Sequence, residues 1–465
     1  MEIVLVLISQ VFAVALGHVI LSLFFKKDMD STPLIEVLAL SYVVGFGLIP
    51  LYMILLYLAG IGFSYRTLYA PILLFICIGY AYLLYRDRRI SINLKYKKFD
   101  RMSLVFISLI TFEIIHSFFR ALIKPVESFD SVASFAIKAK IFFLAKCIPP
   151  DYFHNIATNF PHPYYPLMIP LQETFCFISM GSFNDMLVNI IFPMHFLALV
   201  ILFYFNTKAV TSRMCALVFT FLIASLNELN RFSTMGYTDI HFALYVCIGF
   251  LYWYRYVTSK KENALFFYIP AIFSAFAIFT KDTGYMVPAL YLLLSVIYRR
   301  EKKVVKEPFI MYIRYLAVTS LLILPWIYLR IKLGPSQTFI KKDILDMGYF
   351  ICLAKERILP ILYEFQANAF GLKKWNMLWP VFMTLFIINY RWSWKTPLKY
   401  ITALIVSVFI LYFLFYLGVD PLAFGRGRDY AFSLRSGMNR HLIHALPLIM
   451  FWLACLFKEM CHDEK

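Results

Sequence analysis

Three acidic side chains stand beside the ends of long apolar stretches, where a carboxylate is costly to keep. Asp130 comes a few residues after "MSLVFISLITFEIIHSFFRALI", Asp239 comes directly before "IHFALYVCIGFLYWY", and Asp282 follows "IFSAFAIFTK". Such groups are stabilised by a charged partner or by a wet cavity. A partly buried carboxylate can also take a proton from a hydroxyl or an amine. The three acids therefore predict one shared polar pocket.

Cationic and aromatic side chains accompany these acids in five short motifs. The motifs are "FDSVASFAIKAK" around Asp130, "NFPHPYYPLMIP" at 159–170, "NRFSTMGYTDIHFALY" at 230–245, "FTKDTGYMVPALY" at 279–291 and "GRGRDYAFSLRSGMNRHLIHALPLIM" at 425–450. Asp130 and Asp239 are the candidate catalytic residues. The candidate substrate-binding residues are Lys138, His162, Tyr164, Tyr165, Arg231, Lys281, Asp282, Arg435 and Arg440.

Each of the key side chains also has a purely structural interpretation. The three acids each precede a segment that could be a helix, so any of them could be a cap. His162 stands between two prolines and could belong to a rigid turn, and Arg440 at the start of the last apolar run could anchor that run at a membrane surface. The spacing alone leaves both interpretations open.

The composition indicates a helical membrane protein. Of the 465 residues, 61% are hydrophobic and 15% are charged, and the mean hydropathy is +0.72. A soluble protein would be about 45–50% apolar and about 25% charged. The apolar runs are continuous and reach about 20 residues, the length that crosses a bilayer as a helix. The sequence therefore predicts an all-α, polytopic membrane protein.

Thirteen membrane spans are expected, the first of them a retained helix without a cleavage site. They lie at 3–25, 34–60, 68–85, 102–123, 186–206, 213–229, 239–256, 264–280, 284–298, 310–331, 376–390, 398–418 and 441–457. The apolar segment 166–182 carries Gln172 and Glu173, and it is expected to be a helix lying at the outer interface.

The basic residues orient these spans. Lysine and arginine gather in the segments 86–101, 255–263, 299–307 and 391–395, which should face the cytoplasm together with the C-terminal tail. The longer segments 124–185, 230–238, 332–375 and 419–440 should then face outward with all five motifs. The net charge of +18 includes many cations in these outward segments. They would suit anionic headgroups or an anionic substrate arriving at the outer leaflet, and no nucleic-acid partner is expected.

Several kinds of chemistry have no signature in the sequence. No zinc-binding pattern, phosphate-binding loop or G-x-S-x-G motif is present, and most of the eight cysteines stand in apolar runs or in the tail. Cys147 and Cys352 both lie in outward segments, where a disulfide between them is conceivable.

The order of the five motifs resembles that of the GT-C glycosyltransferases, and most of all their protein O-mannosyltransferase-like and lipid A aminoarabinose transferase-like members. In that family an acid opens the first large outward loop, as in "FDSVASFAIKAK". "HPYYPLMIPL" is similar to the family's H-P-D-Y-P-L element, "GYTDIHFALY" to GY-A-D-L and "TKDTG" to TK-N/D-E-G. An Arg and a Pro open the last span, as in "NRHLIHALP". The resemblance covers roughly residues 100–457.

The resemblance implies an activity. The chain would move a sugar, with inversion, from a polyprenyl-phosphate carrier to a lipid, glycan or protein acceptor on the outer face of the membrane. Asp130 would be the general base, and Arg231, Lys281, Arg435, Arg440 or His162 would stabilise the carrier phosphate. The first loop would hold juxtamembrane helices. No cofactor is certain, but a divalent metal is possible, and the multi-pass protein would lie in a prokaryotic inner or plasma membrane.

The chain also departs from the family pattern. Residues 1–100 add three spans before the expected core at 101–465, and Ser131 replaces the second acid that many relatives carry. A glycan polymerase or ligase would share the outward basic segments and would use a large late loop such as 332–375. A transporter or flippase of lipid-linked saccharide should show polar residues at mid-membrane depth.

Overall fold

The computed structural model describes residues 1–87, 99–154, 164–259, 263–302, 307–333, 346–419 and 430–462. These residues form helices and turns, and none of them belongs to a strand. The prediction of an all-α fold is therefore confirmed for the part of the chain that is described.

The described helices follow one another along the chain. They are α1 (Glu2–Ser31), α2 (Leu34–Leu58), η1 (Tyr65–Tyr69), α3 (Ala70–Asp87), α4 (Arg101–Leu122), η2 (Ser131–Ala136), α5 (Ile137–Ala145), α6 (Met168–Met180), η3 (Leu187–Ile190), α7 (Ile191–Val210), α8 (Arg213–Ala224), α9 (Asn227–Phe232), α10 (Asp239–Ala243), η4 (Leu244–Ile248), α11 (Gly249–Thr258), α12 (Ala264–Thr280), η5 (Asp282–Tyr285), α13 (Met286–Lys302), α14 (Glu307–Leu333), α15 (Met347–Ala369), α16 (Leu372–Trp375), α17 (Leu378–Lys395), α18 (Lys399–Gly418), α19 (Tyr430–Ile443) and α20 (Leu446–His462).

Seven of the described segments are long and apolar enough to cross a membrane. They are Glu2–Ser31, Leu34–Leu58, Tyr65–Arg86, Arg101–Leu122, Leu187–Val210, Phe309–Leu333 and Lys399–Gly418. The pair α19 and α20, bent by 46°, makes an eighth if it counts as one span. The other predicted spans correspond to helices that are shorter, such as α8 and α12, or interrupted, such as α10 with α11. The structure thus supports a multi-pass membrane protein with seven or eight such helices.

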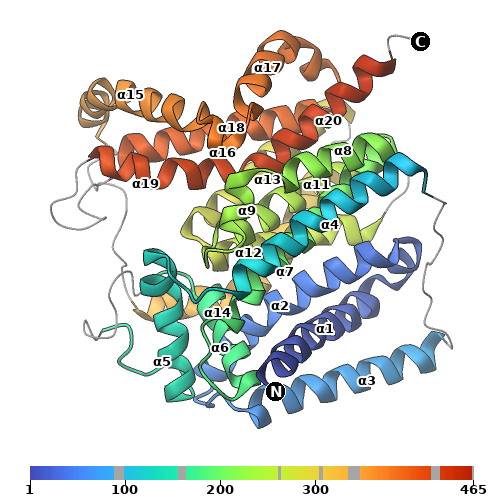
Figure 1. The fold of residues 1–465 in the computed structure, drawn as a ribbon, viewed down its shortest axis with the longest axis vertical. Coiled ribbons are helices and arrows are strands. Elements are labelled where there is room, and N and C mark those ends of the chain that lie inside the picture. Colours follow the sequence, from blue (N-terminus) through green and yellow to red (C-terminus); the bar gives the residue numbers. More distant parts are fainter. Residues whose placement is uncertain are drawn as a thin grey trace.

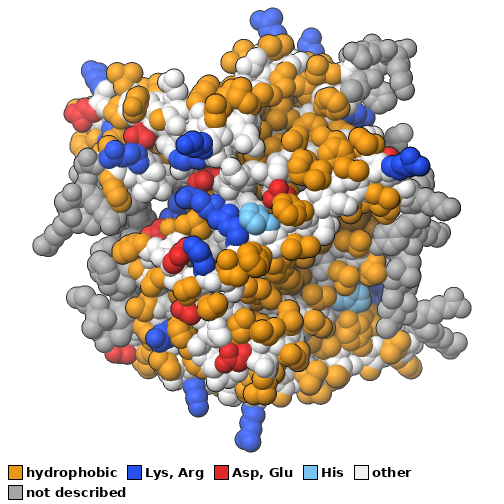
Figure 2. Space-filling view, in the orientation of Figure 1, with side chains coloured by type: hydrophobic (Ala, Val, Ile, Leu, Met, Phe, Trp, Pro, Cys, Tyr) orange, Lys and Arg blue, Asp and Glu red, His pale blue; other side chains and the backbone are white. Residues whose placement is uncertain are grey.

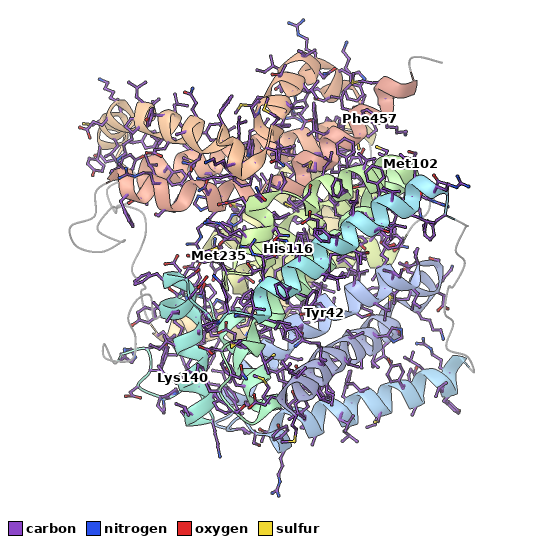
Figure 3. All side chains as sticks on the ribbon, in the orientation of Figure 1. Tyr42, Met102, His116, Lys140, Met235 and Phe457 are labelled. Atoms are coloured by element: carbon purple, nitrogen blue, oxygen red, sulfur yellow. The ribbon has the colours of Figure 1, made fainter. Side chains whose placement is uncertain are left out.

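The surface agrees with a membrane environment. Large apolar side chains stand exposed on the long helices, among them Phe112 on α4 and Leu321 on α14. Figure 2 shows one face of the molecule, which is covered largely by hydrophobic side chains. Soluble proteins rarely expose such broad apolar surfaces. Figure 3 shows α4 lying along this face, with Met102 near one end and His116 further along.

The helices form two groups that meet along a seam. Figure 1 shows α15 and α17 to α20 together along the top of the view, the upper group, with α1 to α14 below them, the lower group. The groups join where α20 packs on α7 and α8, where α18 packs on α13, and where α19 packs on α10. In the lower group α1 and α2 pack on α6, α7 and α12. The N-terminal helices therefore share one hydrophobic core with the rest of the chain.

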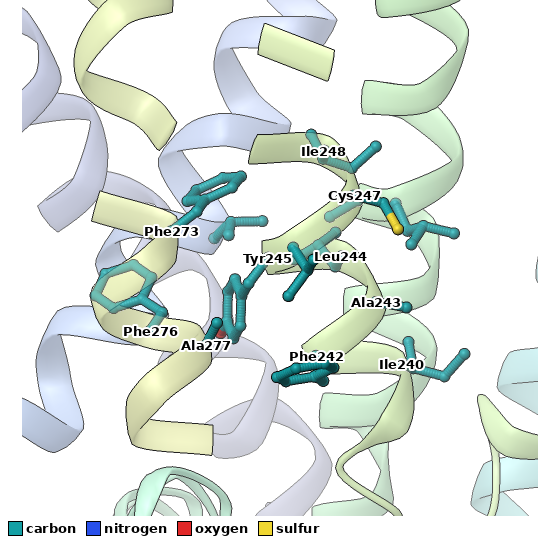
Figure 4. Packing of buried hydrophobic residues seen from close by; sticks show 14 of the residues in the cluster. Ile240, Phe242, Ala243, Leu244, Tyr245, Cys247, Ile248, Phe273, Phe276 and Ala277 are labelled. Carbon is teal, nitrogen blue, oxygen red and sulfur yellow. The ribbon is translucent and has the colours of Figure 1, made fainter. Parts of the chain in front are cut away.

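The region around η4 shows how tightly this core is filled. Figure 4 shows Tyr245 facing Phe273 and Phe276 of α12, with Phe242 one turn away. The ring centroids of Tyr245 and these two phenylalanines lie 5.8 and 5.4 Å apart. Because aromatic rings at such distances attract one another and exclude water, the segment that begins with Asp239 is held firmly in place.

Contacts between connecting segments agree with the two predicted sides of the membrane. Asn184 donates to Glu2 at 2.7 Å and Asn227 donates to the Lys373 carbonyl at 3.1 Å. Asn184, Asn227 and Lys373 belong to, or border on, segments predicted outside, and Glu2 lies at the N-terminus, which three spans separate from the segment 86–101 predicted inside. On the other side, the guanidinium of Arg213 lies 5.3 Å from the ring centroid of Phe99. Which side faces the cell exterior stays a prediction.

Two segments differ from expectation. The segment 166–182 does form a helix, α6, but all thirteen of its residues are buried. A helix lying on a membrane surface would leave one face exposed, so α6 packs inside the protein. The late outward segment 332–375 contains α15, a helix of 23 residues. Its charged side chains, such as Lys355 and Glu356, lowered the hydropathy that would have revealed it.

Candidate active site

Three of the five motifs meet at Arg440. Its Nη1 donates to Asp130 Oδ2 at 2.6 Å and its Nε donates to Asp239 Oδ2 at 3.0 Å. Asp130 is separated from Arg440 by 310 positions in the chain. The guanidinium also lies 4.8 Å from the ring centroid of Tyr237. Folding thus brings together side chains from the start, the middle and the end of the predicted core, as the sequence led us to expect for Asp130 and Asp239.

Asp239 is the centre of the cluster. Its side chain is fully buried, and its Oδ1 accepts hydrogen bonds from Lys281 Nζ at 2.6 Å and His444 Nε2 at 2.9 Å. With Arg440 it therefore has three donors, enough to stabilise a buried carboxylate. Thr238 is the N-cap of α10 and makes no side-chain cap bond. Asp239 is not a simple helix cap.

Asp130 lies at the open edge of the cluster. Its side chain is 38% exposed, whereas that of Asp239 is 0% exposed. Asp130 immediately precedes η2 and makes no side-chain cap hydrogen bond there. Its neighbour Ser131 donates to the Met235 carbonyl, which ties the start of η2 to the segment before Asp239. The carboxylate is thus held by Arg440 and stays reachable from outside the protein.

A histidine that sequence reasoning did not select completes the cluster. His444 stands at the break between α19 and α20, and Tyr412 Oη lies 2.6 Å from its Nδ1. When Nε2 donates to Asp239, Nδ1 must accept from the Tyr412 hydroxyl. A signal was present, since Arg440 and His444 are four residues apart in "RHLIH" and side chains at that spacing share a helix face.

A second group of charges lies beside the first. Arg330 at the end of α14 pairs with Asp282 at 3.6 Å, and its Nη1 donates to the Tyr164 carbonyl. Lys138 on α5 is buried, with Asp282 and Arg330 as its charged neighbours. Tyr165 is half-buried, near Arg440 and both Asp239 and Asp282. Sequence reasoning missed Arg330, although a cation at the end of a predicted span was a visible signal.

Burial shifts the acid–base properties of this second group. Loss of hydration lowers the pKa of Lys138 to about 7, although Asp282 opposes the shift. Burial likewise raises the pKa of Asp282, against the effect of Arg330 and Lys138. Burial also lowers the pKa of Lys281 to about 8, and there Asp239 opposes the shift. Lys138 therefore changes charge close to neutral pH.

The remaining predicted site residues have other surroundings. Arg231 pairs with Glu228 on its own helix at 3.0 Å. Arg435 is exposed on α19, five residues before Arg440. The ring of Tyr164 stacks on Phe153 with centroids 6.2 Å apart. His162 lies outside the described residues.

The donor set does not fit a metal ion. In the described ranges, no group of three or more His, Cys, Asp or Glu side chains is arranged to hold one. Asp130 and Asp239 instead share the guanidinium of Arg440, which supplies the positive charge between them. The chemistry of this cluster is that of two carboxylates, two cations and an imidazole. No family model, curated protein or solved structure matches the chain.

Proposed function

We propose that this chain is an integral-membrane glycosyltransferase with a GT-C-like arrangement of about thirteen spans. It would move a sugar from a polyprenyl-phosphate carrier to a lipid, glycan or protein acceptor on the outer face of a prokaryotic inner or plasma membrane. The observation that carries the proposal is the contact of Asp130 with Arg440 beside Asp239. It joins residues from three of the five motifs in one half-open polar site.

Asp130 is the general base in this proposal. It accepts the proton of the acceptor hydroxyl or amine while the acceptor atom forms a bond to the anomeric carbon of the sugar. The bond from that carbon to the phosphate oxygen breaks, and its electron pair leaves with the carrier phosphate. Attack opposite to the leaving group inverts the anomeric centre. A base must reach its proton and be ionised beforehand, and the 38% exposure and the Arg440 ion pair of Asp130 suit both needs.

Asp239 has a positioning role. It is fully buried and accepts from Arg440, Lys281 and His444, so it is too deep to receive a proton from an acceptor. Its negative charge orients Arg440, which in turn orients Asp130. Asp239 thus acts through Arg440, and Asp130 alone is the catalytic carboxylate.

In this proposal the carrier phosphate lies between the cluster around Arg440 and the group that contains Arg330 and Lys138. The positive charges of Arg440 and Lys281 are partly neutralised by their ion pairs with Asp130 and Asp239. Lys138 and Arg330, which share the single acid Asp282, add further cations close by. A site with more cations than acids favours an anionic leaving group. No step of the proposed reaction passes through a metal ion.

The proposal is tested with purified wild-type protein in liposomes containing a radiolabelled polyprenyl-phosphate sugar and a set of candidate acceptors. We expect unglycosylated polyprenyl phosphate to accumulate together with a labelled acceptor. Movement of intact labelled carrier between leaflets, without cleavage of the sugar–phosphate bond, would contradict the proposal.

Movement of the carrier without cleavage would favour a transporter. One observation supports that alternative. Buried polar side chains are present in the middle of the bundle. Tyr42 Oη donates to Gln10 Oε1 at 3.1 Å and lies 3.3 Å from His195 Nδ1, and the rings of His195 and His241 lie 3.7 Å apart. Sequence reasoning identified few such residues. A glycan polymerase or ligase stays the other alternative, because α15 lies in the late outward segment that such an enzyme would use.

A further inference from the structure

The helix α4 carries three ionisable side chains along one flank, although it is one of the apolar helices that can cross a membrane. Glu113, His116 and Arg120 follow one another at spacings of three and four residues, which places them on one face. All three are half-buried. The buried face of α4 consists of the small or apolar residues Ser103, Ile110, Ser117 and Ala121. The ionisable stripe lies at the edge of that face.

The stripe is open to the outside of the bundle. Figure 3 labels His116 on α4, and Figure 2 shows histidine side chains on the largely hydrophobic face of the molecule seen in this orientation. Acidic and basic side chains gather close to one of these histidines in the same view. Ionisable groups in membrane helices almost always face the bundle interior or a wet cavity. A stripe open to the lipid side therefore indicates a polar ligand.

The neighbouring helix α9 makes only long hydrogen bonds to the ionisable side chains of α4. Asn230 of α9 donates to Glu113 Oε2 at 3.4 Å and accepts from Arg120 Nη1 at 3.5 Å. These distances are at the long end for hydrogen bonds, whereas charge-assisted bonds are normally about 2.7–2.9 Å. The carboxylate of Glu113, the amide of Asn230 and the guanidinium of Arg120 can thus still form hydrogen bonds to a ligand.

The row leads to the candidate active site. Arg120 comes ten residues before Asp130, and Asn230 comes nine residues before Asp239. Between them, Ser117 and Ser233 are joined by a hydrogen bond of 2.6 Å. Glu113 is nine residues from the end of α4 at Leu122, which corresponds to about 14 Å along the helix. The stripe therefore reaches from the outer end of α4 into the span.

A second copy of the chain fits this stripe poorly. In a twofold dimer within a membrane the axis runs along the membrane normal, so each residue faces its own copy at the same depth. Glu113 would then approach Glu113 and Arg120 would approach Arg120. Like charges would repel in a medium of low dielectric constant. A lipid headgroup, in contrast, can offer different groups at the two depths.

We propose that Glu113, His116, Arg120 and Asn230 form a lateral binding site for the headgroup of the polyprenyl-phosphate sugar. This inference rests on the proposed function for the identity of the lipid. Arg120 pairs with the phosphate, because a guanidinium binds phosphate through two parallel hydrogen bonds. Asn230, His116 and Glu113 offer further hydrogen bonds to the headgroup. The carrier thus docks from the lipid side along the edge where α4 meets α9 and passes on toward Asp130.

The test measures binding apart from transfer. A photoreactive polyprenyl-phosphate sugar is added to the full-length protein in phosphatidylcholine nanodiscs, and labelled peptides are mapped. We expect labelling of α4 that unlabelled carrier displaces. Arg120→Gln should weaken binding of the carrier about tenfold or more, the range for one lost hydrogen bond to a charged group. The matched variant Arg101→Gln, at the other end of the same helix, should bind normally.

Three results would overturn the site. Unchanged carrier affinity in a well-folded Arg120→Gln protein would remove its role, and equal displacement by phosphatidylglycerol would make the stripe a general lipid contact. Crosslinks between α4 helices of two copies would assign the stripe to a dimer interface. If the carrier binds as expected but is never cleaved, the site stands and the proposed function fails. If transfer occurs and Arg120→Gln has no effect on carrier binding, the proposed function stands and the lateral site fails.

Discussion

At the scale of single residues, the candidate active site depends on how Asp239 is neutralised. Its carboxylate is fully buried and takes hydrogen bonds from Lys281, His444 and Arg440. Removing one partner from a buried pair leaves an uncompensated charge in the protein interior. The two acids that look alike in the sequence should therefore respond differently to the same substitution.

We predict that Asp239→Ala lowers the free energy of unfolding by about 3–5 kcal/mol, the range for breaking a buried ion pair. The double variant Asp239→Ala with Lys281→Met should recover part of this loss, since it removes a stranded cation. Thermal unfolding in detergent measures both. A melting temperature that Asp239→Ala leaves unchanged would show that the cluster is not a buried ion pair.

Lys138 should make binding of the carrier depend on pH. Burial lowers its pKa to about 7, with Asp282 and Arg330 as charged neighbours. Because a lysine is charged below its pKa, its attraction for a phosphodiester is present below pH 7 and fades as the pH rises through about 7. We expect carrier affinity to fall over that range in the wild type, and in Lys138→Met only the later change of Lys281, whose pKa is about 8, should be left.

The control for this pH dependence is Lys140→Met, which removes an exposed lysine two residues away. It should retain the wild-type pH profile. The sign for stability is opposite: the folded-state pKa lies below the unfolded value of about 10.4, so the unfolded chain holds more protons between pH 7 and 10. The cost of burying charged Lys138 should therefore shrink as the pH rises through that window.

Site residues could be predicted from the sequence where a charged side chain stands beside a long apolar run. Asp130, Asp239 and Asp282 were expected in one pocket. The structure brings the first two together at Arg440, whereas Asp282 pairs with Arg330 beside them. The partner of each was not predictable, because pairing is decided by how helices far apart in sequence pack. His444 and Arg330 were missed for that reason, and Arg231 joined Glu228 instead.

At the scale of elements, the break between α19 and α20 positions two of the site's side chains. Pro447 is the second residue of α20 and lacks a backbone N–H, so it cannot continue the hydrogen bonding of α19. The helices meet at 46° as a result, and His444 at the break turns toward Asp239. A proline in the sequence thus sets the direction of an imidazole.

We predict that Pro447→Ala straightens this pair of helices. The distance between spin labels at the exposed positions Arg435 and Phe457 should increase, because a straight rod is longer than a bent one. The bond from His444 to Asp239 should weaken, and the melting temperature should drop. An unchanged distance distribution would show that tertiary packing, and not the proline, holds the bend.

Helices were predictable where hydropathy was strong. The expected spans at 34–60 and 398–418 agree closely with α2 and α18. Hydropathy did not reveal α15, because this helix carries several charges. One of them is the buried Arg357, which donates to the carbonyls of Leu417 and Val419 at 2.7 Å each. Hydropathy also misplaced α6, since a helix buried in protein and one lying at an interface can have similar composition.

At the scale of the whole molecule, the orientation in the membrane decides what the site can reach. Glu127 lies in the segment predicted outside and Lys395 in one predicted inside, and both are exposed. In a background that lacks the native cysteines, we expect an impermeant thiol reagent added to cells to label Glu127→Cys but not Lys395→Cys. The reverse pattern would place the site on the cytoplasmic side.

The seam between the two groups of helices explains why distant motifs form one site. Asp130, Asp239 and Lys281 belong to the lower group, and Arg440, His444 and Tyr412 belong to the upper one (Figure 1). The order of motifs in the sequence suggested a common pocket, but no pattern in the sequence revealed that it would lie between two groups of helices.

The most direct test of the account is sugar transfer by Asp130→Asn. Asparagine keeps the shape of the side chain but cannot accept the proton, and a general base contributes about 10²–10⁴-fold to the rate. Glu127→Gln, an exposed acid three residues away that pairs with Lys124, is the matched control. Purified variants in liposomes are supplied with a polyprenyl-phosphate sugar, and release of polyprenyl phosphate is followed beside the melting temperature. We predict a collapse of turnover for Asp130→Asn at near-normal stability, with Glu127→Gln active. Full turnover by a well-folded Asp130→Asn protein would contradict it.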